Sequence, residues 1–500
     1  MISEIIKWAG KWKPMVGGFI DPSSKSCLHH TCSMKNHKIL RIWQFSFLAL
    51  PAIAAALCLE LNGAEPQRPN IVLMLADDLG WSDLSCYGSE QVKTPHIDSL
   101  AKDGLKFTDF YAGSAVCSPS RACLLTGRYP VRVGVYSWIH TSHRMHLRDE
   151  EVTIAEMLKD LEYSTIHSGK WHLGYQLEKG SGDQPDPGDQ GFDYWMATGN
   201  NAVPSHLNPR NFVRNGVPVG EMEGYSCQLV VDEALDWYEN HRDPAQPFFM
   251  NIWFHEPHAR VAAPEHLSAR HKDTKNPDYY GCIENLDLAV GRLLDHLDKD
   301  GVAENTLVIF TSDNGSYMEG SNGNLRGKKT QLWEGGIREV GLMRWPGRIS
   351  PGSISSFPCG VVDVFPTLAA VVGGRIPSDR IIDGIDLTPV FGGRTPRRQR
   401  PLYWFYNPSR PVCVVRSGLF SLIADPVMDL PRGNMFMESY IPDIKTTGLT
   451  NFRLYNHSGD PGQVMDVSQQ FPEIFEELKA SMNEIHRSVV DEAYDWSEEK

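Results

Sequence analysis

The segment from Cys117 to Arg128 places a potential nucleophile next to the predicted start of a helix. Ser118 is a residue type that caps helices, Pro119 suits the first helical position, and Gly127 can end the helix. We expect a short helix over residues 122–126, with its free backbone N–H groups directed at the cysteine. Because these groups form the positive end of the helix dipole, an anion is favoured there. An isolated cysteine at such a place is more often a buried structural residue, so the interpretation depends on the other motifs.

Two apolar segments, far apart in the sequence, each stop at a pair of oxygen-bearing side chains. The pairs are Asp77 and Asp78 after residues 70–76, and Asp313 and Asn314 after residues 306–312. Each pair alone is compatible with a turn or a helix cap. Continuous apolar runs, however, are typical of central parallel strands, whose carboxyl ends share one edge of a sheet. If the two strands are neighbours, their oxygen ligands predict a site for calcium or magnesium rather than zinc.

A lysine and a histidine follow a third predicted strand. The segment Gly-Lys-Trp-His-Leu-Gly occupies residues 169–174, directly after a short apolar strand over residues 164–167. In extended backbone Lys170 and His172 project from the same face. A cation beside an imidazole suits a bound anionic ester and its leaving oxygen. Both side chains are also compatible with an ordinary surface position.

Two later segments add further candidates for anion binding. Residues 248–254 form an apolar strand that ends at His255, with His258 following a proline. A histidine at a strand end is more often structural, and His255 is the weaker of the two substrate-binding candidates. The segment 326–330 contains a glycine before Lys328, which lets the backbone approach an anion closely.

Together these motifs resemble the signature of the formylglycine-dependent sulfatases of the alkaline phosphatase superfamily. Cys-x-Pro-Ser-Arg followed by Thr-Gly-Arg, and Gly-Lys-Trp-His-Leu-Gly, are segments that this family shows. The resemblance extends from Arg68 to the C-terminus, and Arg68–Trp345 is most similar to the branch of arylsulfatase A and N-acetylgalactosamine-6-sulfatase. It implies that a maturation enzyme oxidises Cys117 to formylglycine.

The resemblance also implies a role for each candidate residue. The implied ligands of the metal, calcium or alternatively magnesium, are Asp77, Asp78, Cys117, Asp313 and Asn314. Arg121 and Lys170 would hold the hydrated aldehyde, one hydroxyl of which attacks sulfur. His172 would deprotonate the second hydroxyl, so that sulfate is expelled by C–O cleavage. His258 or Lys328 would protonate or stabilise the leaving oxygen, and both would bind the sulfate together with Lys170.

The implied activity is hydrolysis of a sulfate monoester on a carbohydrate or an aryl group. Two other classes stay open. A phosphodiester or phosphonate monoester hydrolase of the same superfamily can use the same aldehyde and many of the same ligands, whereas a non-enzymatic binder of sulfated glycans would be expected to have lost part of the set. We expect the sugar to be recognised by residues 138–146 and 199–215.

The elements that position these residues predict an α/β fold. Helices and strands alternate up to about residue 400, which predicts a large mixed, mostly parallel sheet flanked by helices over residues 65–400. Short strands over residues 403–406, 412–416 and 419–424, followed by a helix over 472–490, predict a smaller C-terminal subdomain at 401–500 with an antiparallel sheet plus a helix.

Residues 1–64 have the pattern of a leader. A basic stretch at 35–41 precedes the uncharged residues 42–59, and Ala64 provides a cleavage site, so we expect a signal peptide that begins at Met34, the true translation start. The protein would then be periplasmic or extracellular, with no membrane attachment after cleavage. A retained membrane anchor is the alternative, which Pro51 disfavours.

Charge and cysteine content bound the remaining possibilities. The net charge of −14, without a long basic run, argues against a nucleic-acid partner. The chain has ten cysteines, of which three lie in the leader and one is Cys117. The six that would remain after conversion permit disulfides, and unpaired buried cysteines are equally compatible with the spacing.

Overall fold

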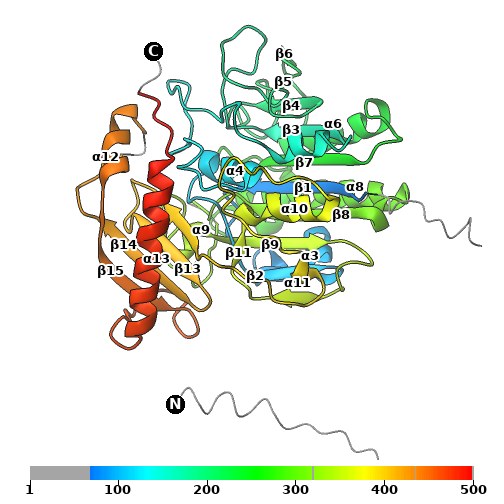
Figure 1. Cartoon of the computed structure of the whole chain (residues 1–500). Coiled ribbons are helices and arrows are strands. Elements are labelled where there is room, and N and C mark those ends of the chain that lie inside the picture. Colours follow the sequence, from blue (N-terminus) through cyan, green and yellow to red (C-terminus); the bar gives the residue numbers. More distant parts are fainter. Residues whose placement is uncertain (1–67, 318–319, 434, 498–500) are drawn as a thin grey trace, which may run out of the picture. The chain divides into compact units, whose positions relative to one another are not determined.

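The computed structural model describes residues 68–317, 320–433 and 435–497 (Figure 1). These residues belong to one compact unit, Gln67–Lys500. The predicted leader, its cleavage site and the start at Met34 lie outside the described residues. Within the described ranges, every helix is too short or too polar to cross a bilayer.

A mixed sheet of eleven strands forms the centre of the described unit. Its central strands all run parallel, in the order β8 (Thr306–Ser312), β1 (Asn70–Asp77), β7 (Phe248–Pro257), β3 (Ser164–Lys170) and β4 (Tyr194–Thr198). The outer strands are β2 (Leu105–Tyr111), β9 (Arg338–Arg344), β10 (Ser353–Ser355), β11 (Cys359–Gly360), β5 (Val213–Arg214) and β6 (Val217–Pro218). Because only β9 and β5 run against their neighbours in this sheet, the predicted mostly parallel architecture is confirmed.

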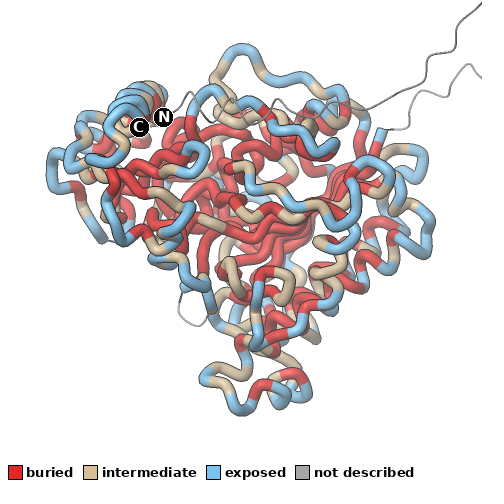
Figure 2. The backbone as a smooth tube through the Cα atoms, turned by 90° about the horizontal axis from the view of Figure 1, so that it is seen from below, coloured by how far each residue is buried: buried red, intermediate tan, exposed pale blue. Residues whose placement is uncertain are grey.

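Alternate residues of β1 face two different hydrophobic cores, so the sheet is covered on both sides. Ile71 packs in one core and Val72 in the other, and the alternation continues along the strand. Helices α3 (Pro95–Lys102), α6 (Ser226–Asn240) and α8 (Pro277–Lys299) cover one face. Helices α4 (Cys117–Thr126), α5 (Ile154–Lys159) and α10 (Val364–Val372) cover the other. The strands therefore run as buried segments through the interior, with exposed residues on the outer loops (Figure 2).

The C-terminal region forms the predicted antiparallel sheet and helix. In the described residues its strands are β12 (Leu402–Phe405), β13 (Cys413–Ser417), β14 (Phe420–Pro426) and β15 (Leu449–Asn456), with helix α13 (Pro472–Asp491) packed against them (Figure 1). The shorter helices are α7 (Glu265–Ser268), α9 (Glu334–Ile337), α11 (Thr388–Phe391) and α12 (Ile441–Thr446). Buried hydrogen bonds join this sheet to the large one: Trp404 Nε1 donates to the Ala112 carbonyl at 2.7 Å, and Arg416 Nε donates to the Tyr111 hydroxyl at 2.9 Å.

All seven cysteines in the described part of the chain are unpaired, and only Cys86 among them is not fully buried. The sequence was compatible with disulfides and with unpaired buried cysteines, and the structure has unpaired cysteines. Burial also raises the pKa of the Cys123 and Cys227 thiols, which keeps them protonated and unreactive.

Candidate active site

Cys117 is the first residue of α4 and lies at the carboxyl edge of the large sheet. The helix begins earlier than predicted, because Val116 is the N-cap, in extended backbone. The prediction that Ser118 caps the helix was wrong: its hydroxyl accepts a hydrogen bond from the Ile139 backbone N–H at 2.9 Å instead. Gly127 ends the helix with a φ of 66°, as predicted. The side chain of Cys117 therefore lies at the positive end of the helix dipole.

The two predicted metal strands are neighbours, and their terminal residues converge. Strands β1 and β8 pair in parallel, and ligand atoms of Asp77, Asp78, Cys117 and Asp313 all lie within 4.8 Å of one another. Asn314 donates from Nδ2 to Asp78 Oδ1 at 2.7 Å, and its own buried Oδ1 accepts no hydrogen bond from any described residue. A buried amide oxygen without a donor fits a metal ligand. The donor set, three carboxylates and one amide oxygen, therefore suits a hard divalent cation such as calcium.

Each of the three carboxylates also has its own basic partner. The pairs are Lys170 Nζ with Asp77 Oδ2 at 2.6 Å, Lys329 Nζ with Asp78 Oδ1 at 2.6 Å, and Arg121 Nη2 with Asp313 Oδ2 at 2.8 Å. The formal charges of these six groups cancel. A divalent cation added to this set would leave the site net positive by two, which suits an anionic substrate.

The pKa values of two of these carboxyl groups move in opposite directions. Burial opposes ionisation of Asp77, but the positive charges of Lys170, His258 and Arg121 outweigh it and hold its pKa well below the usual range. Burial and the negative charge of Asp77 raise the pKa of Asp313 to about 6, against the effect of Arg121. A metal ion between the two would favour the ionised form of both.

The Cys117 thiol lies where these groups meet. Its sulfur is 3.4 Å from Asp77 Oδ1, 3.6 Å from Lys170 Nζ and 3.4 Å from Lys329 Nζ. Burial, with the charges of Asp313 and Asp77, raises the pKa of the thiol, so that it is protonated at neutral pH. A protonated thiol is a poor nucleophile. The surroundings therefore do not activate the sulfur itself as a nucleophile.

The structure places Lys329 at the site, one residue after the predicted Lys328. Lys328, the predicted residue, is exposed, and its ammonium lies over the ring of Tyr317 at 5.5 Å. Lys329 occupies the site instead. The backbone N–H groups of Lys329 and Thr330 are hydrogen-bonded to carbonyls of adjoining loops, and Thr330 has a left-handed φ of 74°. This turn directs Lys329 toward Cys117 and its predecessor toward solvent.

The hydrogen bonds of His172 define which of its ring nitrogens carries the proton. Its Nε2 lies 2.9 Å from the Ile139 carbonyl oxygen, and because a carbonyl only accepts, Nε2 carries the proton. The other nitrogen, Nδ1, is buried and has no hydrogen-bond partner in the described ranges. Burial, with the charges of Lys170 and Arg121, lowers the pKa of His172 well below the usual value. The imidazole is therefore neutral at pH 7, with a free lone pair.

The two histidines of the β7 end have different surroundings. His258 Nε2 lies 3.5 Å from Asp78 Oδ2, and its Nδ1 donates to the Ala259 carbonyl at 2.6 Å. Burial lowers the pKa of His258, although Asp78 opposes the shift. His255 is 1% exposed, bonds Thr198 through Nε2 at 2.8 Å and is not among the described residues that line the active-site cavity. His258 therefore lines the cavity, whereas His255 is buried and does not line it.

A cavity of about 680 Å³ opens onto these groups. Its polar lining includes Cys117, His172, His258 and the ammonium group of Lys329, and the rest of the lining is largely apolar, with Trp138 and Tyr317 among its residues. Asn200 and Asn201 line both this cavity and a neighbouring one of about 370 Å³. Trp138 belongs to the first segment predicted to contact the sugar, and the two asparagines belong to the second.

Comparison with known proteins decides the family. A sequence model described as Sulfatase matches residues 69–374. The chain belongs to the sulfatase family. Steryl-sulfatase of Rattus norvegicus is 35% identical over 448 residues, which cover 71% of this chain and 76% of that protein. N-acetylgalactosamine-6-sulfatase of Canis lupus familiaris is 35% identical over 375 residues, which cover 68% of this chain and 69% of that protein.

The fold of this sulfatase also matches solved structures. The crystal structure of Ps i-CgsB in complex with k-i-k-neocarrahexaose superimposes with a TM-score of 0.73 at 26% identity, covering 86% of this chain and 94% of that one. Together with the family match, this makes the protein a sulfuric ester hydrolase.

Some residues of the sulfatase site carried no sequence signal. Asn201 Oδ1 lies 3.4 Å from Lys170 Nζ, and the Trp253 ring lies 5.0 Å from the Arg121 guanidinium carbon. Trp253 is part of an apolar strand, so the sequence predicts a core residue there. Asn201 is one of many loop asparagines, and nothing in the sequence distinguishes it. Only the pairing of β7 with β1 and β3 brings Trp253 beneath the arginine.

Proposed function

We propose that this sulfatase hydrolyses sulfate monoesters of carbohydrates, using formylglycine formed at Cys117 by a maturation enzyme and a bound calcium ion. The observation that carries the proposal is the convergence of Lys170, Lys329 and Arg121 with three carboxylates around one inert thiol. The carbohydrate assignment is supported by the names of two similar proteins, an N-acetylgalactosamine-6-sulfatase and an enzyme solved with a neocarrahexaose.

The chain's own residues would bind and orient the ester. Formylglycine supplies, once hydrated, an oxygen nucleophile in place of the thiol. Lys170 and Lys329, whose ammonium groups lie 3.6 and 3.4 Å from the sulfur of Cys117, would hold the sulfate at the nucleophile. Arg121 is fixed by Asp313 and by the Lys170 carbonyl, and it keeps the Asp313 carboxylate in place. These charge-assisted contacts need little rearrangement when substrate binds.

The metal would be held by Asp77, Asp78, Asp313 and Asn314, with the modified side chain of residue 117 completing the set. A bound calcium ion supplies positive charge for the sulfate oxygens. Asp78 has a left-handed φ of 64° directly after β1, and its backbone N–H donates to Asp313 Oδ1 at 3.2 Å, which ties the ends of the two strands together.

Two histidines would handle protons. His172 Nδ1 carries a buried lone pair and would accept a proton from a hydroxyl of the hydrated aldehyde at residue 117. His258, when protonated, would donate from Nε2 to the leaving oxygen. Lys329 would stabilise the same oxygen, because Asp78 and other nearby negative charges outweigh its burial and raise its pKa well above the usual value.

Matched aryl sulfate and aryl phosphate substrates test the proposal. We expect the sulfate to have the larger kcat/KM, with the phosphate acting as an inhibitor, since the site's positive charge attracts both anions. A larger kcat/KM for the aryl phosphate, or for an aryl phosphate diester or phosphonate monoester assayed beside it, would overturn the proposal in favour of a phosphohydrolase. A panel of defined sulfated sugars would then identify the carbohydrate.

Export is a separate part of the proposal, supported by the charge and hydropathy pattern of residues 35–64. N-terminal sequencing of the secreted protein should find a mature start near residue 65. An intact leader on the active protein would contradict cleavage and favour a retained anchor.

A further inference from the structure

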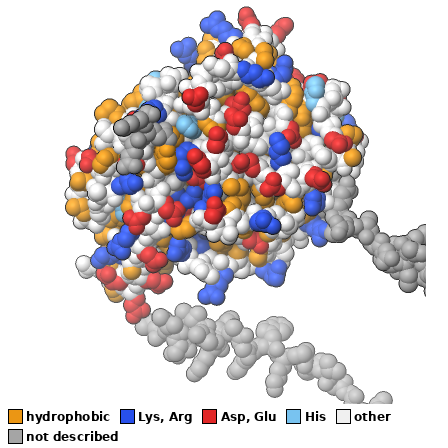
Figure 3. Space-filling model, turned by 45° about the horizontal axis from the view of Figure 1, so that its top comes forward, with side chains coloured by type: hydrophobic (Ala, Val, Ile, Leu, Met, Phe, Trp, Pro, Cys, Tyr) orange, Lys and Arg blue, Asp and Glu red, His pale blue; other side chains and the backbone are white. Residues whose placement is uncertain are grey.

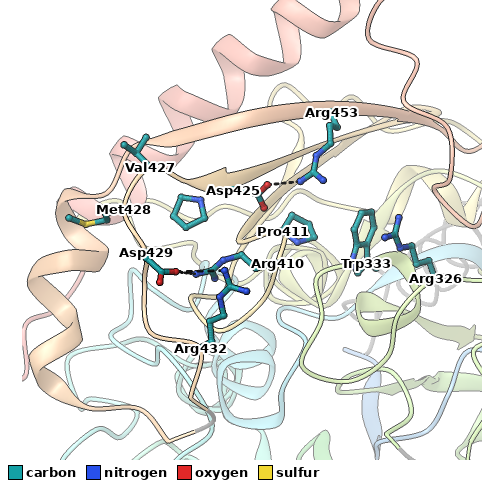
Figure 4. Close-up of a pocket in the computed structure, with 11 residues that line it drawn as sticks. Arg326, Trp333, Arg410, Pro411, Asp425, Val427, Met428, Asp429, Arg432 and Arg453 are labelled. Carbon is teal, nitrogen blue, oxygen red and sulfur yellow. Dashed lines mark hydrogen bonds and ion pairs between the residues drawn. The ribbon is translucent and has the colours of Figure 1, made fainter.

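A cavity of about 550 Å³ lies between the loop that follows β8 and the C-terminal sheet (Figure 4). The charged side chains among the described residues that line it are Arg326, Arg410, Arg432, Arg453, Asp425 and Asp429. We call this cavity the arginine cleft. Basic and acidic side chains are interspersed over the face of the molecule shown in Figure 3, and the chain as a whole carries a net charge of −14. A cleft with four arginines against two aspartates is therefore a local excess of positive charge.

On one side of the arginine cleft, the guanidinium group of Arg326 is held in a fixed orientation. The Arg326 guanidinium carbon lies 3.6 Å from the centre of the Trp333 ring, and its Nη1 donates to the Gln463 carbonyl at 2.9 Å. Stacking on the buried indole fixes the plane of the fork. Within the described ranges, its Nε and Nη2 groups have no hydrogen-bond partner, which leaves them available to a ligand.

The opposite side is formed by two arginines that repel each other. Arg410 is held by three backbone carbonyls, and Asp429 is its nearest carboxylate at 3.5 Å. Burial and the charge of Arg432 lower the pKa of Arg410 despite Asp429 and Asp425. The positive charge here is under-compensated, so an added anion would lower the free energy of the cleft.

Strand β15 contributes the fourth arginine of the cleft, Arg453. Arg453 Nη2 donates to Asp425 Oδ2 at 2.8 Å, and Figure 4 shows this pair on the C-terminal sheet side of the cavity. Its Nε is buried without any hydrogen-bond partner in the part of the chain that the structure describes. A buried unpaired donor is costly unless a ligand or water satisfies it.

We propose that the arginine cleft binds a second anionic group, a sulfate ester or carboxylate, of a polyanionic carbohydrate substrate. Guanidinium forks match the paired oxygens of both groups. The loop that contributes Arg326 and Trp333 also contributes Lys329 to the active site, so one segment joins the two anion sites. The inference rests on the proposed carbohydrate function and extends it: the cleft selects oligosaccharides with several charges over singly charged esters.

Equilibrium binding in a Cys117→Ala background, which prevents turnover, tests the proposal. The probes are inorganic sulfate and a chondroitin 6-sulfate hexasaccharide. The test variant is Arg326→Gln/Arg432→Gln, and the control is Arg400→Gln, a 55% exposed arginine that pairs with Glu484 outside the cleft. We expect the double variant to weaken hexasaccharide binding at least about tenfold, from two lost charge-assisted contacts, and the control to leave it within about twofold. We expect Asp429→Asn to strengthen binding, because this 86% exposed carboxylate competes with the ligand.

Equal hexasaccharide affinity in the parent and the double variant would overturn the proposal. So would cleft-dependent binding of inorganic sulfate that is as tight as that of the hexasaccharide, since this would indicate a free-anion site. Hydrolysis of a small aryl sulfate, measured in the Cys117-containing enzyme, should be unchanged in the double variant. If the parent hydrolyses no sulfate ester but the double variant still loses binding, the proposed function fails and the cleft assignment stands.

Discussion

The active site and the arginine cleft both gather arginines and carboxylates, but they do so in opposite environments. The side chains of Arg121, Asp77 and Asp313 are fully buried, and Arg121 pairs with Asp313 at 2.8 Å. In the cleft, Arg432 is 65% exposed and lies 3.7 Å from Asp429, which is 86% exposed. Removing one partner of a buried pair leaves an uncompensated charge, whereas an exposed pair contributes little. Chemistry is therefore expected to depend on the first region, and affinity for large substrates on the second.

The largest effect is expected at Cys117. Cys117→Ser, made without a serine-type maturation system, should remain folded and lower kcat at least about a thousandfold, because the aldehyde is the source of turnover. Mass analysis of the parent peptide should show loss of the thiol and gain of an aldehyde. Full activity of protein that carries an unmodified thiol would refute this assignment.

Asp313→Asn should come next. It removes a negative charge from the proposed metal site and from the carboxylate 2.8 Å from the buried Arg121, so calcium affinity and kcat should fall together, by about a hundredfold or more. Calorimetric calcium titration and steady-state kinetics measure the two effects. The matched control Asp429→Asn, in the arginine cleft, should change neither for a small aryl sulfate. Activity of the parent that survives exhaustive chelation would count against the metal site.

The two adjacent lysines provide a sharper test of the geometry. Lys329→Ala should lower kcat/KM for an aryl sulfate about a hundredfold, as expected for loss of a preorganised charged donor. Lys328→Ala should change it less than about twofold, because an exposed ammonium makes little net contribution. The reverse order of effects would show that the loop adopts another conformation in the working enzyme.

The smallest effect concerns pH. Burial, Lys170 and Arg121 hold the pKa of His172 below its usual value, so the imidazole stays neutral as pH falls through 6.5, and its role as a base is lost only at lower pH. With calcium saturating, protonation of His172 should therefore not lower kcat/KM between pH 7.5 and 6, and protonation of His258, whose pKa is also lowered, can only raise it over this range. An acid limb centred near 6.5 under these conditions would contradict the assignment.

The sequence was sufficient to predict which residues meet at the carboxyl edge of the sheet, because the pattern that marks a central strand is local. Continuous apolar runs that stop at Asp77 and Asp313 are typical of central strands with polar ends, and parallel pairing then brings the ends together. The choice between Lys328 and Lys329 could not be made, because side-chain direction in a loop depends on tertiary hydrogen bonds rather than on alternation. The same reason explains why the prediction for Ser118 was wrong: its hydroxyl accepts a hydrogen bond from the backbone N–H of Ile139, 21 residues away.

The arginine cleft was beyond sequence analysis for a different reason. Arg326 lies 84 residues or more from the other three arginines, and no motif connects it with them. Their proximity is produced by the packing of the C-terminal sheet against the loop after β8.

The hydrogen bonds from Trp404 and Arg416 to the last residues of β2 and the loop that follows bear on how the molecule unfolds. Both donors are buried, and residues of the two sheets share one hydrophobic core. Separating the C-terminal sheet would expose that core and break these bonds together, so neither sheet can melt first at low cost. Residues 68–497 are therefore expected to denature in a single cooperative transition, and a chain truncated near residue 400 is expected to aggregate rather than persist as a smaller enzyme.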